Sequence, residues 1–437
     1  MIIKKAVPVL LTLLLMIPTL AGCSKEESSK SQKGVTTIEF WTAPNPPQQA
    51  YWKQMAQEFE KEHPEIRIKV SPIKETPSSE AYIISALIAG DGPTISENIS
   101  RGFAAQLAES HVLEPLDQRK DLKAVQSRNM TKTMAGWTFP DKHQYVLPVY
   151  SNPMLFGWRI DILTKLGISR PPKTYSEVLD TARKLKEKYP NKFLWAKADL
   201  ADPTGWKRWF DFFMLYDAAS NGNLFVRGNR FVADEKAAKQ VFQFVLDLSH
   251  ENALLTKQAE NPFETGMSIF SDLGPWTFNY WAEKFPNMKM NKTFTLAYPP
   301  VPDGMDLKHP KTFADSKGIV LFAQKPEAEK KAAVQFLNWV YANPEHDLTW
   351  FKTTNLPPAR DDLSSNPVFR SFLDKNPALL PYAEAIPDGV PVMANSKYNQ
   401  IQTYIGTKAF NQVVKGEKSP DQAWNDMKIA IQKELGE

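Results

Sequence analysis

A strand, a helix and a second strand follow one another near the start of the chain, and this order constrains the fold more than any other feature. Residues 36–41 are β-branched and aromatic, as expected of a strand. Trp52, Met55 and Phe59 recur at helical spacing, and residues 66–70 then alternate apolar and basic side chains. A helix between two neighbouring strands makes a right-handed crossover, so the strands lie parallel in one sheet. The pattern predicts an α/β protein.

Helical patterns of the same kind recur along the rest of the chain. Apolar side chains lie at helical spacing in residues 175–185, 238–248 and 328–340. A last helix is expected to begin at Ser419-Pro420, because serine is a favoured N-cap and proline fits the first turn. The 437 residues, 42% of them hydrophobic, suffice for two ordinary domains with separate cores. We therefore expect two lobes.

The charge of the chain argues against one class of partner. The formal net charge is +4, and residues of both signs are scattered along the sequence. A nucleic-acid-binding protein concentrates its basic residues on one face or segment. We therefore expect no nucleic-acid partner.

The N-terminus has the pattern of an export signal. Lys4 and Lys5 precede an apolar stretch, residues 6–20, that is too short and too interrupted by proline to span a membrane. Residues 20–23, Leu-Ala-Gly-Cys, resemble the lipobox of bacterial lipoproteins. Cys23 is the only cysteine, so no intramolecular disulfide can form.

The lipobox resemblance implies a lipid-anchored protein. Residues 1–22 would be a signal peptide, and Cys23 would carry the lipid, including palmitate. Residues 23–34, rich in Ser, Lys and Glu, would be a flexible tether. The mature protein would then lie on the extracellular face of the cell membrane. An ordinary secretion signal with a chance cysteine is the alternative.

Common catalytic patterns are missing from the sequence. Gly90-x-Gly92 has no third glycine, and His250-Glu251 has no second histidine at the spacing of a zinc protease. No Gly-x-Ser-x-Gly motif occurs, and a single cysteine excludes thiolate zinc sites. We expect no catalytic residue, no metal and no cofactor, although sequence alone leaves a pair of catalytic carboxylates open.

Tryptophans near polar loop residues are the strongest remaining indication of function. They are Trp41, Trp195, Trp206, Trp209 and Trp276. A loop tryptophan offers a flat apolar face to the C–H face of a sugar ring, while polar neighbours satisfy the hydroxyl groups. The alternative for each is a place in the core, which we expect for Trp52, Trp339 and Trp424 on apolar helix stripes.

Further motifs occur in a fixed order over nearly the whole chain. They are residues 38–41, 59–70, 86–94, 147–163 and 165–175, Gly274-Pro275-Trp276, residues 336–340 and residues 356–360. In order and spacing they resemble the sugar-binding subclass of bacterial extracellular solute-binding proteins, the lipoprotein substrate receptors of ATP-binding-cassette importers. Three departures occur: Thr94 stands where Asp is usual, Tyr175 stands where Trp is usual, and Ser316-Lys317-Gly318 replaces a double glycine in a loop that commonly faces the ligand.

The resemblance implies a two-lobed, periplasmic-binding-protein-like α/β fold with hinge segments and a ligand cleft between the lobes. Lobe 1 would comprise residues 35–150 and 316–354, and lobe 2 residues 151–315 and 355–437. The chain would cross between them near residues 148–151, 314–318 and 353–356. Closure on the ligand would create the form that an importer recognises.

The same resemblance implies which side chains meet the ligand. They are Trp41, Asn45, Glu97, Asn98, Ser151, Asn152, Trp206, Trp276, Asp315 and Arg360. The aromatic side chains would stack on sugar rings, and the others would hydrogen-bond hydroxyl groups. Asp91, between two glycines, is instead expected to form a turn.

The leading interpretation is a monomeric receptor, not an enzyme, that captures a carbohydrate and delivers it to the membrane permease subunits of an importer. The number of aromatic residues favours an oligosaccharide. One alternative is the same fold binding a peptide, a polyamine or a uronate, the last kept open by Arg101, Lys207, Arg208 and Arg360. A surface polysaccharide hydrolase and a receptor that serves a sensor kinase also stay open.

Overall fold

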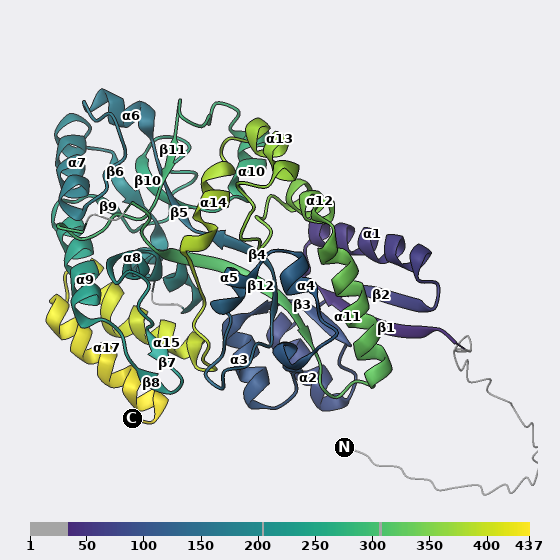
Figure 1. The fold of residues 1–437 in the computed structure, drawn as a ribbon. Coiled ribbons are helices and arrows are strands. Elements are labelled where there is room, and N and C mark those ends of the chain that lie inside the picture. Colours follow the sequence, from purple (N-terminus) through teal and green to yellow (C-terminus); the bar gives the residue numbers. More distant parts are fainter. Residues whose placement is uncertain (1–33, 203–204, 306–307) are drawn as a thin grey trace, which may run out of the picture. The chain divides into compact units, whose positions relative to one another are not determined.

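Two main β-sheets, each with its own hydrophobic core, are built by the chain from Thr36 to Glu437 (Figure 1). The structure, a computed structural model, describes residues 34–202, 205–305 and 308–437, and leaves out the side chains of residues 205–207.

The first sheet has strand order β13-β12-β3-β1-β2, and β4 pairs with the other edge of β12. Its strands are β1 (Thr36–Thr42), β2 (Ile66–Pro72), β3 (Ile95–Ser100), β4 (Leu147–Pro153), β12 (Thr312–Leu321) and β13 (Gly389–Pro391). Strands β1 and β2 pair in parallel, with Thr36 opposite Ile66, which confirms the prediction from the strand–helix–strand order. Strand β12 runs antiparallel to both β3 and β4.

Helices cover both faces of the first sheet. They are α1 (Pro46–Glu62), α2 (Ser79–Ala89), α3 (Arg101–Glu109), α4 (Ala124–Ser127), α5 (Thr131–Ala135), α11 (Glu327–Ala342) and α12 (Pro344–Thr354), with the 3₁₀ turn η1 (Leu116–Gln118). One core gathers side chains from α1, α11 and α12, and another gathers them from α2 and α3. Trp52 is fully buried in the first of these cores, as predicted, and Trp339 packs partly buried against it.

The second sheet has strand order β11-β5-β10-β6-β9. Its strands are β5 (Leu155–Trp158), β6 (Phe193–Ala196), β9 (Leu254–Leu255), β10 (Ser268–Leu273) and β11 (Thr295–Ala297), and a separate hairpin joins β7 (Val226–Arg227) to β8 (Arg230–Phe231). The α and 3₁₀ helices of this half are α6 (Ile160–Lys165), α7 (Tyr175–Lys188), η2 (Ala198–Ala201), η3 (Gly205–Phe210), α8 (Phe212–Ala219), α9 (Glu235–His250) and α10 (Thr277–Lys284).

The C-terminal part of the chain is helical. Its elements are α13 (Pro367–Lys375), α14 (Leu380–Ala385), η4 (Ile386–Asp388), α15 (Tyr398–Tyr404), the π-helix η5 (Ile405–Phe410), α16 (Asn411–Val414) and α17 (Pro420–Leu435). Helix α17 begins where predicted, because the Ser419 hydroxyl accepts the Gln422 N–H and the Gln422 side chain accepts the Ser419 N–H. Trp424 on α17 is buried in the core of the second sheet, as predicted.

The two sheets are connected by short passages of chain. Met154 alone separates β4 of the first sheet from β5 of the second. The residues after β13 lead to α15, whose Tyr398 and Ile401 belong to the core of the second sheet. The segment after α12 stays beside β4, because Ser151 donates its N–H to Pro357 O and Ala359 donates its N–H to Val149 O.

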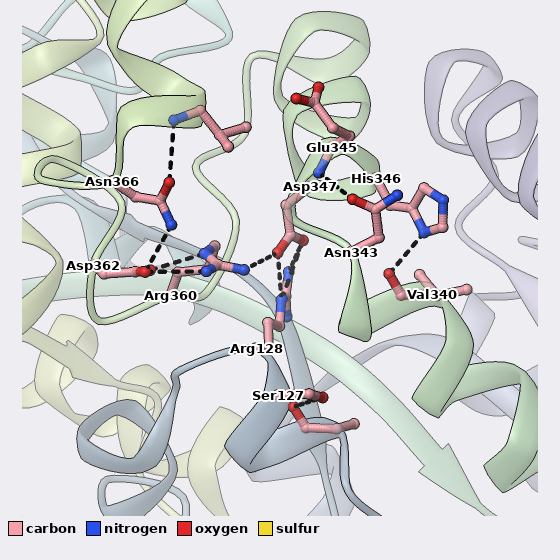
Figure 2. Close-up of polar contacts among 12 residues, drawn as sticks. Ser127, Arg128, Val340, Asn343, Glu345, His346, Asp347, Arg360, Asp362 and Asn366 are labelled. Atoms are coloured by element: carbon pink, nitrogen blue, oxygen red, sulfur yellow. Dashed lines mark hydrogen bonds and ion pairs between the residues drawn. The ribbon is translucent and has the colours of Figure 1, made fainter.

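A buried network of charges fixes the start of β4 (Figure 2). Arg128 is fully buried and donates to the carbonyl oxygens of Pro148 and Val149, while its Nη2 lies 2.7 Å from Asp347 Oδ1. Arg360 donates to the same Asp347 carboxylate at 3.0 Å and to Asp362 at 2.9 Å. The network therefore joins α4, β4, α12 and the segment before α13.

We predict that Asp347→Ala destabilises the fold by about 3–5 kcal/mol, because it leaves the Arg128 guanidinium buried without its carboxylate. The measurement is the free energy of unfolding from urea denaturation. Asp180→Ala is the matched control, since Asp180 pairs with Arg183 at the surface, where removal costs at most about 1 kcal/mol. Equal losses in the two variants would contradict the prediction.

Candidate ligand-binding site

Four polar or aromatic side chains lie on one face where β4 and β12 pair. In the antiparallel register, Asn152 lies opposite Asp315, and Tyr150 lies opposite Lys317. Residues directly opposite each other, and residues two apart on one strand, point to the same face of a sheet. We name this set of side chains, made of Tyr150, Asn152, Asp315 and Lys317, the strand floor. Tyr150 and Asn152 are buried, and the Tyr150 ring stacks on Trp350 at 6.1 Å.

Asn152 has the most unusual environment on the strand floor. Its side chain is fully buried, and neither its amide oxygen nor its amide nitrogen has a hydrogen-bond partner among the described residues. Leaving a buried polar group unpaired costs about 1–3 kcal/mol, so native proteins rarely tolerate it without a reason. The amide therefore has hydrogen-bonding capacity that no described residue uses.

Lys317 and Asp315 supply the charges of the strand floor. Both side chains are partly exposed, and Lys317 Nζ donates to Asn98 Oδ1 at 2.9 Å. Burial raises the pKa of the Asp315 carboxyl, and the Lys317 ammonium opposes that rise. Asn98 has φ +67°, a backbone conformation that asparagine tolerates better than most residues. The strand floor thus combines the ammonium donor of Lys317, the carboxylate acceptor of Asp315 and the amide of Asn152 on neighbouring strand positions.

Glu97 positions the loop after β1. Its side chain is buried, and Oε2 accepts the Ala43 N–H at 2.9 Å. Burial raises the pKa of Glu97 to about 7. The Ala43 N–H, the Trp52 indole and the Lys317 charge each act to lower this pKa, but burial has the larger effect. Because Ala43 lies two residues before Asn45, this bond fixes the loop that leads into α1.

Two residues predicted for the first loop are also placed by the structure. Asn45 is exposed, and its Oδ1 accepts the Gln48 N–H as the N-cap of α1, so this oxygen already has a partner. Trp41 is partly buried, with its ring centroid 5.2 Å from that of Tyr82. Neither residue is seen in contact with the strand floor.

Aromatic side chains extend from the strand floor towards the second sheet. Phe313 lies two residues before Asp315 and shares its face of β12. Its ring stacks on Trp209 at 5.1 Å and meets Phe210 at 5.8 Å, and Phe210 in turn meets Trp276 at 6.4 Å. The structure thus connects Trp276 with the strand floor through Phe210 and Phe313.

Some of these aromatic residues could have been found from the sequence. The segment Trp206-x-x-Trp209-Phe210 concentrates aromatics just after a polar stretch, which is the available signal for Trp209 and Phe210. Trp206 itself lies in η3, in the part of that helix whose side chains are not described. Phe313 has no such signal, because its role follows from the register of β12.

Three predicted residues are not brought to the strand floor. Ser151 lies on the opposite face of β4, where its hydroxyl is 3.1 Å from that of Ser316. Arg360 is buried in the charge network of Figure 2, where its guanidinium pairs with two carboxylates. Cys23, the predicted lipidation site, lies outside the described residues.

A cavity of about 190 Å³ lies between elements of the two cores and borders the aromatic neighbours of the strand floor, since Trp209 and Phe313 are among its lining residues. Arg101 and Phe139 line it on one side, and Trp209, Phe213 and Asp217 on the other. None of the residues predicted to bind ligand lines this cavity. We therefore assign the candidate site to the strand floor and its aromatic neighbours.

Other kinds of site were also considered. Within the described residues, no group of three or more His, Cys, Asp or Glu side chains is arranged to hold a metal ion. No helix in the described part of the chain is long and apolar enough to cross a membrane.

The fold and the unpaired polar floor define a ligand-binding protein. A family model described as "Bacterial extracellular solute-binding protein" matches residues 54–380, so the chain belongs to that extracellular family. Its members are binding proteins, which agrees with the prediction that the chain is not an enzyme. Membership also confirms the predicted family and the periplasmic-binding-protein-like α/β fold.

Solved structures and one curated relative resemble the chain to different degrees. An uncharacterized protein, lmo0859 from Listeria monocytogenes EGD-e, is 52% identical, with a TM-score of 0.89 over 92% of this chain and 100% of that one. The cyclic alpha-maltosyl-1,6-maltose binding protein from Arthrobacter globiformis is 19% identical, with a TM-score of 0.79 over 92% of this chain and 99% of that one. The arabinooligosaccharide-binding protein of Bacillus subtilis (strain 168) is 26% identical over 195 residues, 42% of each chain.

We predict that Glu97 makes the stability of the protein depend on pH. An acid whose pKa is raised from 4.5 to about 7 on folding keeps its proton in the folded state after the unfolded state has released it. Stability therefore falls as the pH rises through this window, by about 3 kcal/mol in all. The Glu97→Gln variant keeps an acceptor for the Ala43 N–H but has no carboxyl to titrate. Its stability should therefore not show this fall with rising pH.

The measurement is urea denaturation of both proteins at several pH values across this window. As the pH rises, the free energy of unfolding of the wild type should fall relative to that of Glu97→Gln. Parallel curves for the two proteins would show that the Glu97 carboxyl titrates normally.

Proposed function

We propose that this chain is the lipid-anchored receptor of an ATP-binding-cassette importer and that it binds a neutral carbohydrate on the strand floor. The unpaired amide of Asn152 carries the proposal, because a sugar hydroxyl can donate to its oxygen and accept from its nitrogen. Lys317, Asn98 and Asp315 offer further partners, and Trp276 offers an exposed ring face.

The charges of the site favour a neutral sugar over a uronate. Glu97 and Asp315 are two acids near one ammonium group, that of Lys317. Four basic residues in the sequence left a uronate ligand possible. Two of them already have acidic partners: Arg360 is paired with Asp347 and Asp362, and Arg208 is paired with Asp211. A uronate would therefore find neither of these two arginines free to pair with its carboxylate.

Names of relatives support the same class of ligand. The curated relative is named for arabinooligosaccharide, and structural relatives were solved as a cyclic maltosyl-maltose binder and with cycloalternan. We propose an oligosaccharide for this chain as well, and propose that it passes the sugar to membrane permease subunits as a monomer.

We propose further that the protein has two lobes that close on the sugar, lobe 1 at residues 35–150 and 316–354 and lobe 2 at 151–315 and 355–437. The first sheet would lie mainly in lobe 1 and the second in lobe 2, with β13 and the first part of β12 at the boundary. Contacts between the two cores support this. Tyr398 OH donates to Glu80 Oε1 at 2.5 Å, and its ring lies against Gly102, where a Cβ would come within 2.6 Å.

We predict that neutral oligosaccharides raise the melting temperature of the protein spanning residues 24–437 and are recovered intact. A ligand at about 100 times its dissociation constant stabilises the folded state by about 2.7 kcal/mol, which corresponds to a shift of several degrees. The measurement is a thermal-shift screen against neutral sugars, uronates, peptides and polyamines. A shift with only the non-sugar compounds, or recovery of a cleaved sugar, would overturn the proposal.

Asn152→Leu tests the residue that carries the proposal. It should abolish the sugar-induced shift without lowering the melting temperature of the free protein, because it replaces an unpaired amide by an apolar group of similar size. Ser316→Ala is the matched control on the opposite face of β12, and it should keep the sugar-induced shift.

We propose that Cys23 carries the lipid that holds the protein at the cell surface. A Cys23→Ser variant expressed in a bacterium with lipoprotein processing should lose lipid attachment, since only the cysteine thiol can take it. The measurement is the distribution between the membrane fraction and the medium, together with the mass of the N-terminal peptide. Equal membrane retention of the variant and the wild type would contradict a lipid anchor at this residue.

A further inference from the structure

A buried acid lines the cavity between the two cores. Asp217 belongs to α8 and is only 4% exposed. Within the described residues, nothing hydrogen-bonds its carboxylate or forms an ion pair with it. Burial raises the pKa of Asp217 well above its ordinary value, and no neighbouring charge acts against that rise. Since an acid buried without a partner destabilises the folded protein, its presence calls for an explanation.

A cation without a carboxylate partner lines the other side of the cavity. Arg101 donates from Nη2 to the carbonyl oxygen of Thr138 at 2.7 Å, but its Nε is buried and has no hydrogen-bond partner. No acid in the described part of the chain pairs with its guanidinium, and burial lowers the pKa of Arg101 to about 10, which leaves it charged at neutral pH. Arg101 is also the first residue of α3, where the positive end of the helix dipole disfavours a further positive charge.

Arg101 and Asp217 do not neutralise each other. No ion pair joins them, and burial alone acts on the pKa of Asp217, so the Arg101 charge lies too far away to offset it. Arg227 also lines the cavity, but it is exposed and water solvates its charge. The cavity therefore has a buried acid on one side and a largely desolvated cation on the other, and each still needs a partner of opposite charge.

The size and the walls of the cavity limit what can fill it. Four buried aromatic side chains line it: Phe139, Trp209, Phe213 and Phe313. A cavity of about 150 Å³ is known to hold benzene, so one of about 190 Å³ admits a molecule slightly larger than benzene. Aromatic rings also attract a cation to their faces. Leu224 lines the cavity and is 43% exposed, so a ligand can enter from solvent.

We propose that this cavity is a second ligand site, separate from the strand floor, for a small apolar α-amino acid about the size of valine. The ammonium group of the amino acid pairs with Asp217, its carboxylate pairs with Arg101, and its side chain lies against the aromatic rings. Such a zwitterion supplies both missing charges, whereas a ligand with only one charge leaves the other protein group buried without a partner. This site does not depend on the sugar-receptor function proposed above.

The test is isothermal titration calorimetry of the protein spanning residues 24–437 with three compounds of closely matched carbon skeleton. L-Valine carries both charges, isovalerate lacks the ammonium group, and isobutylamine lacks the carboxylate. The wild type should bind valine at least about tenfold more tightly than either of the other two, because each of them lacks one charge-assisted hydrogen bond. If valine does not bind, or if either of the other compounds binds as tightly, the amino-acid site is overturned.

Two variants assign each charge of the ligand to its partner. Asp217→Asn should lose the preference for valine over isovalerate, because the ammonium group no longer meets a carboxylate, but should keep the preference over isobutylamine. Arg101→Gln should show the reverse pattern. A purely structural role of either residue would weaken all three compounds alike, and that result would overturn the assigned pairing.

Asp180→Asn is the matched control, since Asp180 pairs with Arg183 at the surface and does not line the cavity, and it should bind valine like the wild type. Without ligand, Asp217→Asn should melt at or above the temperature of the wild type, because it removes a buried acid that has no partner. The three compounds test the wild type without any variant, so the site can be overturned even if a variant fails to fold. Failure of valine to bind leaves the proposed receptor function standing.

Discussion

The buried carboxylate of Asp347 is the contact on which the candidate site depends. It neutralises the guanidinium of Arg128 (Figure 2). Arg128 in turn donates to the carbonyl oxygens of Pro148 and Val149. These two carbonyls lie near the start of β4, and Asn152 follows on the same strand, three residues after Val149. Since a shift of one residue would turn Asn152 to the opposite face, the network fixes which side chains form the strand floor.

Sequence reasoning succeeded where the cause of a structure is local. The parallel pairing of β1 and β2 follows from a strand–helix–strand order within about forty residues, and it is present as predicted. The start of α17 follows from a serine and a proline at its first positions, and Ser419 caps it. Trp52 and Trp424 are buried because they lie on apolar helix stripes.

Contacts between distant segments could not be predicted in the same way. The register of β4 against β12 joins residues more than 150 positions apart, and it decides that Asn152 and Asp315 face the same way while Ser151 does not. Arg360 was assigned to the ligand through its motif, but its partners in the structure are Asp362, two residues on, and Asp347. Asp362 was a visible local signal, whereas the unpaired state of Asn152 appears only once the chain is packed.

The two kinds of buried polar group in this structure serve different ends. Arg128 and Asp347 are buried together, so each satisfies the other and the pair holds the fold. Asn152 is buried without a partner, which costs stability in the unliganded protein. Under the proposed function, a sugar that supplies the missing hydrogen bonds would recover this free energy. If the proposed lobes close over the strand floor, the recovered free energy would favour the closed form only when sugar is bound, because a ligand shifts an equilibrium only by its difference in affinity for the two states.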